Sequence, residues 1–195
     1  MSETATVETT QCPIGRSLER IGDGWSLLIL RDALQGVTRF DEFQQRLGIA
    51  PSMLTRRLNA LVADGLMVRR PYSEHPPRVE YVLTACGRDV REVIHALYAW
   101  GNKHLAPEGQ ALRLIDSTTG QEADPVLVDR QTGLPTTDPR FVFIPGPAAK
   151  EKLQRRYATL EQLRARQARD AGVDAAVAAA PDGSQLRPAG LEPVS

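Results

Sequence analysis

The chain has 195 residues, of which 42% are hydrophobic and 25% charged, enough for one full domain and a second small one. Its 24 Lys plus Arg balance its 24 Asp plus Glu, so a charged partner must be met by a local patch and not by the net charge. The first residues lack a basic and apolar leader pattern, and the most apolar stretch, residues 25–30, stops at Arg31. We therefore expect a cytoplasmic protein that is neither secreted nor membrane-spanning. Two cysteines cannot form a disulfide framework.

Two helices are expected before residue 36. Ile14, Leu18 and Ile21 recur at i, i+4 and i+7 after a proline, which is typical of an amphipathic helix with proline in its first turn. A Gly-Asp-Gly sequence breaks this helix. Residues 25–34 follow, with apolar side chains on nearly every side, and we expect this second helix to lie in the middle of the domain.

Two short helices follow in quick succession. The first begins near Thr38, whose spacing from Asp41 is typical of a capping box, and its apolar stripe is Phe40, Phe43 and Leu47. After a three-residue break, a proline opens the next helix, over 51–63. The apolar stripe of this helix consists of Leu54, Leu58 and Leu61.

The pattern then changes from helical to extended. Residues 66–72 and 78–83 are expected to form a β-hairpin, with a proline-rich turn at 73–77. Thr84 is then expected to cap a long helix that runs to about His104.

Two closely spaced helices followed at once by a hairpin are the layout of a winged helix-turn-helix, whose second helix enters the major groove of DNA. On a helical wheel, the side of 51–63 opposite the leucines carries Ser52, Arg56, Asn59 and Ala63, with Thr55 on its flank and Arg57 nearer the core edge. Arginine pairs bidentately with guanine and asparagine with adenine, while serine and threonine bond either phosphate or base. A solvated helix face is the alternative for these side chains.

The predicted hairpin carries a second basic group. Arg69, Arg70, His75 and Arg78 lie on its strands and turn, where they could reach phosphates or an adjacent minor groove. Charge on an edge strand also prevents strand-to-strand aggregation, which is the alternative explanation for Arg69 and Arg70.

Together these motifs resemble the HxlR-type transcriptional regulators, relatives of the MarR group. The resemblance covers about residues 12–105 and rests on Cys12-Pro13 and on segments 21–31, 39–43, 54–58, 64–66 and 76–84. It implies a dimeric bacterial regulator that binds double-stranded DNA, with the first helix and the long helix after the hairpin near the dimer interface. The expected DNA-binding residues are Arg39, Ser52, Thr55, Arg56, Arg57, Asn59, Arg69, Arg70, His75 and Arg78.

One position departs from the family pattern. The family usually has Ser or Asn before the proline that opens the helix over 51–63, whereas Ala50 cannot cap a helix. Ser52 is an alternative cap if the helix starts a residue or two later, and that role would reduce its value for reading bases.

Cys12 is the expected regulatory residue. Beside Pro13, its sulfur would lie near free backbone amides and the positive end of a helix dipole, which favour a reactive thiolate. The resemblance also implies a frequent regulatory cysteine near the N-terminus, so we expect a redox, electrophile or small-molecule effector. A passive cysteine is the alternative, because Glu8 and Glu19 oppose ionisation. Cys86 is expected to be a small packing residue.

Two similar segments follow the long helix, at 114–120 and 127–133, each with an Asp-x-x-Thr-Gly turn. The spacing equals that of a zinc knuckle, but threonine is a poor zinc ligand and both side chains can instead bond the amides of the turn. We therefore expect a ribbon pair without metal or cofactor. Residues 141–144 are expected to add a strand, and a basic helix is expected from Ala148 to about Asp170.

The predicted fold class is mainly α with a β-hairpin wing, a winged helix-turn-helix, plus a small β-ribbon and a helix as C-terminal extension. The expected boundaries are a flexible N-terminus at 1–11, a DNA-binding and dimerisation domain at 12–105, a ribbon module at 106–146, a helix at 147–170 and a disordered tail at 171–195.

Two other function classes compete with a regulator. An enzyme is disfavoured because the sequence has no nucleophile elbow, Walker loop or HExxH motif, and its three histidines lack ligand spacing. A protein-interaction module would use the long helix and the C-terminal ribbon without sequence-specific DNA binding.

Overall fold

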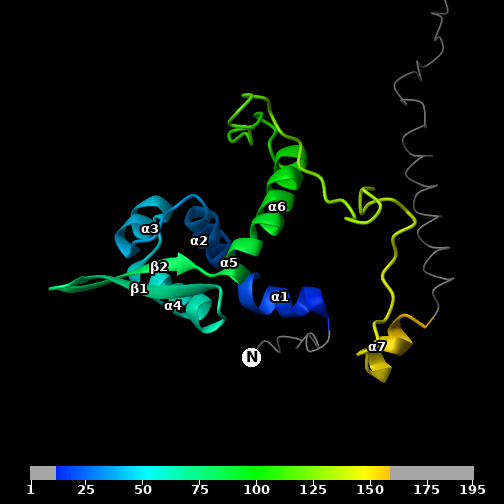
Figure 1. Cartoon of the computed structure of the whole chain (residues 1–195), viewed down its shortest axis with the longest axis horizontal. Helices are drawn as coiled ribbons and strands as arrows, with labels where there is room; N and C mark the ends of the chain where they lie inside the picture. Colours follow the sequence, from blue (N-terminus) through cyan, green and yellow to red (C-terminus); the bar gives the residue numbers. More distant parts are fainter. Residues whose placement is uncertain (1–11, 159–195) are drawn as a thin grey trace, which may run out of the picture. The chain divides into compact units, whose positions relative to one another are not determined.

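The computed structural model describes residues 12–158, in two compact units, one ending at Thr136 and the other beginning at Thr137. The first unit is mostly helical with a two-stranded antiparallel sheet, which confirms the predicted winged helix-turn-helix (Figure 1). Its elements are α1 (Pro13–Ile21), α2 (Gly24–Leu34), α3 (Phe40–Leu47), α4 (Pro51–Ala63), β1 (Met67–Glu74), β2 (Pro77–Leu83), α5 (Ala85–Asp89) and α6 (Arg91–His104). The second unit contains α7 (Glu151–Arg156).

Helix α2 lies at the centre of the first unit, as its apolar sequence predicts. It packs against α3, α4, α6 and β2, and its Ile29 and Leu30 are fully buried. The same core contains Phe43 of α3, the three predicted leucines of α4, and residues of the hairpin such as Met67. The side chain of Asp23 caps α2 by accepting a hydrogen bond from the Ser26 amide at 3.0 Å. The core therefore fixes the helix-turn-helix directly on α2.

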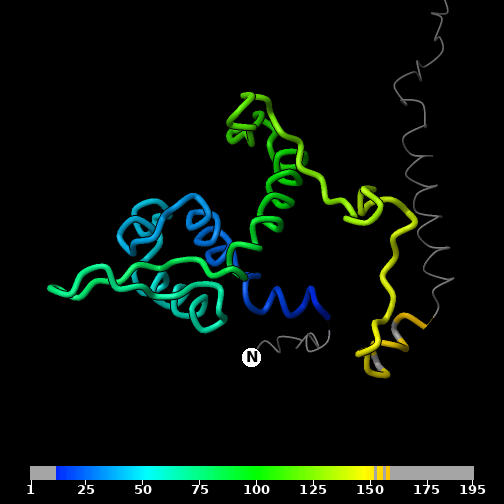
Figure 2. Tube along the Cα trace, in the orientation of Figure 1, coloured from blue at the N-terminus to red at the C-terminus, as the bar shows by residue number. Residues whose placement is uncertain are grey.

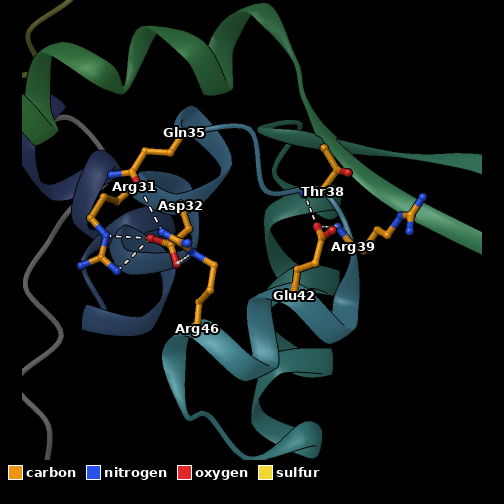
Figure 3. Close-up of polar contacts among 7 residues, drawn as sticks. All are labelled: Arg31, Asp32, Gln35, Thr38, Arg39, Glu42 and Arg46. Atoms are coloured by element: carbon orange, nitrogen blue, oxygen red, sulfur yellow. Dashed lines mark hydrogen bonds and ion pairs between the residues drawn. The ribbon is translucent and has the colours of Figure 1, made fainter.

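A buried carboxylate joins α2 to α3 (Figure 3). Asp32 is only 1% exposed, and its side chain accepts hydrogen bonds from Nε of Arg31 at 2.8 Å and from Nε of Arg46 at 3.4 Å. Arg46 also donates to the side-chain oxygen of Gln35 at 3.2 Å. The backbone carbonyl of Asp32 accepts from the Val37 amide at 3.1 Å, so the same residue closes the turn between the two helices.

Helix α3 begins differently from the expected pattern. The predicted Thr38–Asp41 capping box is wrong, because Arg39 is the residue that precedes the first helical turn. Counting from Arg39, the third helical position is Glu42, whose carboxylate accepts from the Arg39 amide at 3.1 Å and the Thr38 amide at 3.4 Å (Figure 3). One carboxylate thus satisfies two backbone donors at the start of α3.

Helix α4 begins at Pro51 and not later. Ala50 precedes the helix and its side chain makes no capping bond. Pro51 has no backbone N–H, so the first helical position needs no hydrogen-bond acceptor. The expected alternative, in which Ser52 caps a shifted helix, is therefore wrong. Ser52 is the second residue of the helix and its side chain is exposed.

The hairpin extends further than predicted. Pairing runs from Met67 opposite Leu83 to Glu74 opposite Pro77, which shortens the predicted turn at 73–77 to two residues. An irregularity between Pro71 and Ser73 lets this pairing continue to the tip. Figure 2 shows the hairpin projecting past α3 and α4.

The long helix expected after Thr84 is divided into α5 and α6, with Val90 between them. Thr84 caps α5 as predicted, accepting from the Gly87 amide at 3.0 Å, and its hydroxyl donates to the Gly65 carbonyl at 2.7 Å. At Gly87 a Cβ atom would lie 2.0 Å from the Leu66 carbonyl oxygen. This close approach fixes α5 against the start of β1, a tertiary constraint that helical periodicity does not contain.

The C-terminal ribbon is smaller than predicted, because it consists of two isolated bridges, Ile115 to Glu122 and Val128 to Pro135. The predicted turn chemistry is nevertheless confirmed. Asp116 accepts from the Thr118 amide, and Asp129 accepts from the Thr132 amide, each at 2.8 Å. Bonds from these threonines hold the pKa of both aspartates below its ordinary value.

The second unit differs from its predictions at two places. Residues 141–144 are not a strand, because no strand in the described part of the chain pairs with them. Helix α7 is shorter than the helix expected at 147–170, of which residues 159–170 lie outside the described residues. The expected flexible start at 1–11 and disordered tail at 171–195 lie outside them as well.

Replacing the buried carboxylate tests its role. Asp32→Asn should lower the free energy of unfolding by roughly 2–3 kcal/mol, because it removes the charge that both arginines bond while leaving a buried polar group. Urea denaturation followed by circular dichroism measures this difference. Arg46→Gln should cost less, since Arg31 still pairs with Asp32; equal stability of Asp32→Asn and wild type would contradict the proposed role.

Candidate nucleic-acid interface

Helix α4 has one buried and one exposed face. Leu54, Leu58 and Leu61 are fully buried, whereas the residues expected to read DNA face solvent: Ser52, Thr55, Arg56 and Asn59. Arg56 contacts the sulfur of Met53 at 3.0 Å, a weak acceptor that leaves most of the guanidinium donors available. The exposed face therefore offers hydroxyl, guanidinium and amide groups within one row.

Arg57 does not share this exposure. Its side chain is 27% exposed, and its Nε lies 3.1 Å from a carboxylate oxygen of Asp23. Nε makes no aligned hydrogen bond, so the contact is an ion pair between α4 and the start of α2. The structure therefore places Arg57 where it positions α4, apart from the exposed row.

The hairpin contacts α4 through Arg69. The guanidinium of Arg69 donates a hydrogen bond to the side-chain oxygen of Asn59, and both residues are exposed. This bond joins two of the expected DNA-binding residues, one on the wing and one on the helix.

The neighbouring Arg70 has a different partner. It lies directly opposite Glu80 in the hairpin, and its Nε donates to the Glu80 carboxylate at 2.7 Å. This bond from Arg70, followed by one from the Thr38 side chain, holds the pKa of Glu80 below its ordinary value of 4.5. The charge of Arg70 is thus balanced within the hairpin.

The start of α3 also contacts the hairpin. The Arg39 guanidinium lies 4.7 Å from the ring centroid of Tyr72, a cation–π arrangement, and the Thr38 carbonyl accepts from the Tyr81 amide at 2.7 Å. Tyr72 lies at the register irregularity, where a strand can redirect a side chain. Arg39 is therefore placed between the helix-turn-helix and the wing.

The two remaining expected residues lie at the hairpin tip. His75 is in the two-residue turn and Arg78 follows it at the start of β2, and both are exposed. The ten expected residues thus fall into three places: the exposed face of α4, the hairpin with Arg39 beside it, and the half-buried position of Arg57.

Sequence reasoning missed the groups that hold the wing. Tyr72, Thr38 and Glu80 support Arg39 and Arg70, yet none was singled out as functional. Glu80 is the one that the sequence could have given, because the expected strands 66–72 and 78–83, paired across the turn at 73–77, already place residue 80 opposite Arg70.

The two cysteines have different surroundings. Cys12 is half-buried at the start of α1, where its carbonyl accepts from the Arg16 amide at 3.0 Å and its side chain makes no capping bond. Cys86 is exposed, so its expected role as a packing residue is wrong.

Two helices expose apolar side chains. Ile14 and Leu18 on α1 are about as exposed as Leu97 and Trp100 on α6, all near half or more of their surface. Within residues 12–158, no helix is long and apolar enough to cross a membrane, and no three His, Cys, Asp or Glu side chains gather as metal ligands would.

Known proteins with this arrangement include several regulators. Residues 20–109 match the model of the HxlR-like helix-turn-helix family. The HTH-type transcriptional regulator Rv3095 of Mycobacterium tuberculosis is 44% identical over 141 residues, which are 72% of this chain and 89% of that protein. The chain belongs to the HxlR-like helix-turn-helix family. It is therefore a transcriptional regulator with a helix-turn-helix DNA-binding domain, in a family of regulators and not of enzymes.

Solved structures agree with this assignment. PA1374 of Pseudomonas aeruginosa, described as a candidate transcription factor, is 50% identical with a TM-score of 0.55, and the match covers 74% of this chain and 99% of that one. PA1607, described in the same way, is 38% identical with a TM-score of 0.62, covering 69% and 94%. These alignments and that to Rv3095 are longer than residues 20–109, so the relatives share more with this HxlR-like chain than the family domain.

Proposed function

We propose that this HxlR-like regulator binds a two-fold pseudo-symmetric DNA operator as a homodimer in the cytoplasm and responds to a reactive or small-molecule signal. The observation that carries the proposal is the row of exposed polar side chains on α4, on the face opposite its buried leucines. A helix that presents hydroxyl, guanidinium and amide groups on one face suits the donor and acceptor pattern of the major groove.

The proposed DNA contacts follow from position. Ser52, Thr55 and Arg56 lie in the first two turns of α4, the part of a recognition helix that contacts base edges. His75 and Arg78 at the hairpin tip, with Arg39, Arg69 and Arg70 nearer its base, are proposed to contact phosphates or the minor groove. Arg57 has an indirect role, because its ion pair with Asp23 holds α4 in place.

The exposed apolar side chains support a dimer. Leu97 and Trp100 lie three residues apart on α6, so they share one face of the helix, and Ile14 and Leu18 do so on α1. Large apolar side chains that stay exposed on helix faces of the described domain are typical of subunit interfaces. A dimer would present two copies of α4 to half-sites about one helical turn apart.

The DNA-reading role of α4 predicts a change in sequence preference. Arg56→Ala should lower the affinity for the operator by roughly 1–3 kcal/mol and relax one base position, because a bidentate base contact is lost. Competition binding with operator and mixed-sequence duplexes measures the effect. Arg78→Ala is the control, since loss of a phosphate contact weakens both duplexes alike; an unchanged operator preference in Arg56→Ala would show that Arg56 does not read a base.

Introducing a charged side chain on α6 tests the proposed dimer. Wild type should sediment as a dimer at micromolar concentration, and Leu97→Asp should shift it to monomer, because a carboxylate would be buried in the interface. The matched control is Val79→Asp on the hairpin, which is exposed to a similar degree and should leave the dimer intact. A monomeric wild type at this concentration would refute the dimer.

Signal response is proposed to begin at Cys12. Cys12 is a half-buried residue at the start of α1, one of the two helices with exposed apolar side chains, so modification there would displace α1 at the proposed interface.

This proposal predicts different responses from wild type and Cys12→Ser. Mild peroxide, diamide or an aldehyde should change the operator affinity of wild type and leave that of Cys12→Ser unchanged, as measured by DNA titration before and after treatment. Cys86→Ser is the control for the exposed second thiol. If both single variants respond as wild type does, Cys12 is not the switch, and DNA binding by α4 is unaffected by that result.

A further inference from the structure

The contact between Arg69 and Asn59 lies at the junction of wing and recognition helix. Arg69 is two residues beyond the fully buried Met67, and side chains two apart on a strand project to the same face. That face is the one that meets α4, where the Arg69 guanidinium donates to the Asn59 oxygen. Both side chains remain exposed, so the pair is accessible to a large partner.

The hydrogen bond decides which chemical groups the pair can offer. A guanidinium has donors only, so the amide oxygen of Asn59 faces it and the amide NH2 does not take part in this bond. Reading adenine requires the oxygen and nitrogen of one amide to face the base edge together, accepting from N6 and donating to N7. The bond to Arg69 occupies one of the two lone pairs of the Asn59 oxygen and holds the amide beside a cation, and the groups that the pair still offers are chiefly donors, the Asn59 NH2 and the remaining guanidinium N–H groups.

Position along α4 points to the same ligand. Asn59 follows Ser52 by seven residues, about 10 Å along the helix axis at 1.5 Å per residue. Recognition helices contact bases with their N-terminal residues, and side chains further along and on the wing lie closer to the sugar-phosphate backbone. A phosphodiester is anionic and its oxygens are acceptors only, which matches a site that offers a cation and donors.

The charges of the two adjacent arginines differ. Arg70 forms an ion pair with Glu80, whereas Arg69 has no carboxylate partner among the ion pairs of the described residues. Arg69 therefore keeps its full charge for an anion, while its neighbour on the same strand does not.

We propose that Arg69 and Asn59 together bind one phosphodiester of the operator backbone and so fix the recognition helix and the wing on DNA as one unit. This inference rests on the proposed function and assigns Asn59 to the backbone, in place of the adenine contact that its residue type predicts. The two residues are positioning residues, and sequence preference stays with the first two turns of α4.

The test is a salt titration on two duplexes of equal length: one selected by the wild-type protein from a random pool, and one of mixed sequence. Arg69→Ala should reduce the slope of log K against log salt by about 0.9 on both duplexes, equivalent to an affinity loss of about eightfold at 0.1 M salt. Arg70→Ala is the comparison variant and should change the slope less, because Arg70 shares its charge between Glu80 and the DNA backbone, whereas Arg69 has no carboxylate partner among the described ion pairs. Circular dichroism verifies that the variants fold.

Asn59→Ala separates backbone from base contact. It should weaken binding to both duplexes by the same factor, keep the slope and leave the preference at every base pair of the selected site unchanged. The double variant Arg69→Ala/Asn59→Ala should bind nearly as well as Arg69→Ala alone, because the amide acts through the same phosphate.

Several outcomes would overturn the inference. Loss of preference at one A·T pair in Asn59→Ala, with unchanged binding to mixed sequence, would make Asn59 a base reader. Equal slope changes in Arg69→Ala and Arg70→Ala would show that the phosphate site does not belong specifically to Arg69 and Asn59. If wild type binds the selected duplex preferentially and Arg69→Ala leaves the slope unchanged, only the phosphate site fails, whereas absence of DNA binding by wild type contradicts the proposed function as well.

Discussion

The surface proposed to face DNA depends on a carboxylate that is almost completely buried. Asp32 is buried, its bond to Arg46 connects α2 to α3, and Arg31 of α2 bonds the same carboxylate. A buried charge is tolerated when its partners satisfy it, and here both partners keep their outer atoms near water, at 40% and 51% exposure. The contact from Arg46 therefore joins α3 to α2 by a polar interaction in addition to the apolar packing of Phe43.

The start of α3 in turn contacts the wing. The first turn of α3 is held by Glu42, and the residues just before and at its start, Thr38 and Arg39, contact the hairpin. On its other side the hairpin contacts α4 through Arg69. The wing is thus attached to both helices of the helix-turn-helix by polar contacts. Arg39 and Arg69, whose charge suggests contact with DNA, therefore also hold the wing in position relative to α3 and α4.

Sequence patterns predicted the features that depend on near neighbours. Leucines at four- and three-residue spacing gave the buried face of α4, and the Asp-x-x-Thr-Gly turns closed as their side chains suggest. The tertiary pairings were beyond that reasoning. Arg57 meets an aspartate 34 positions earlier, and the guanidinium of Arg39 meets the ring of Tyr72 on the hairpin. Residues 141–144 have the composition of a strand but no strand partner among the described residues, and composition cannot supply one.

The close approach at Gly87 has a mechanical consequence. The Thr84 hydroxyl bonds the carbonyl of Gly65, and the backbone at Gly87 lies so near Leu66 that no side chain fits between them. The end of the recognition helix, the base of the wing and the helical segment leading to α6 therefore meet without a compressible layer of side chains. A rotation of α5 would therefore move the base of the wing with it. In the proposed dimer, a small angular change that reached α5 from α6 would become a larger displacement at the distant hairpin tip.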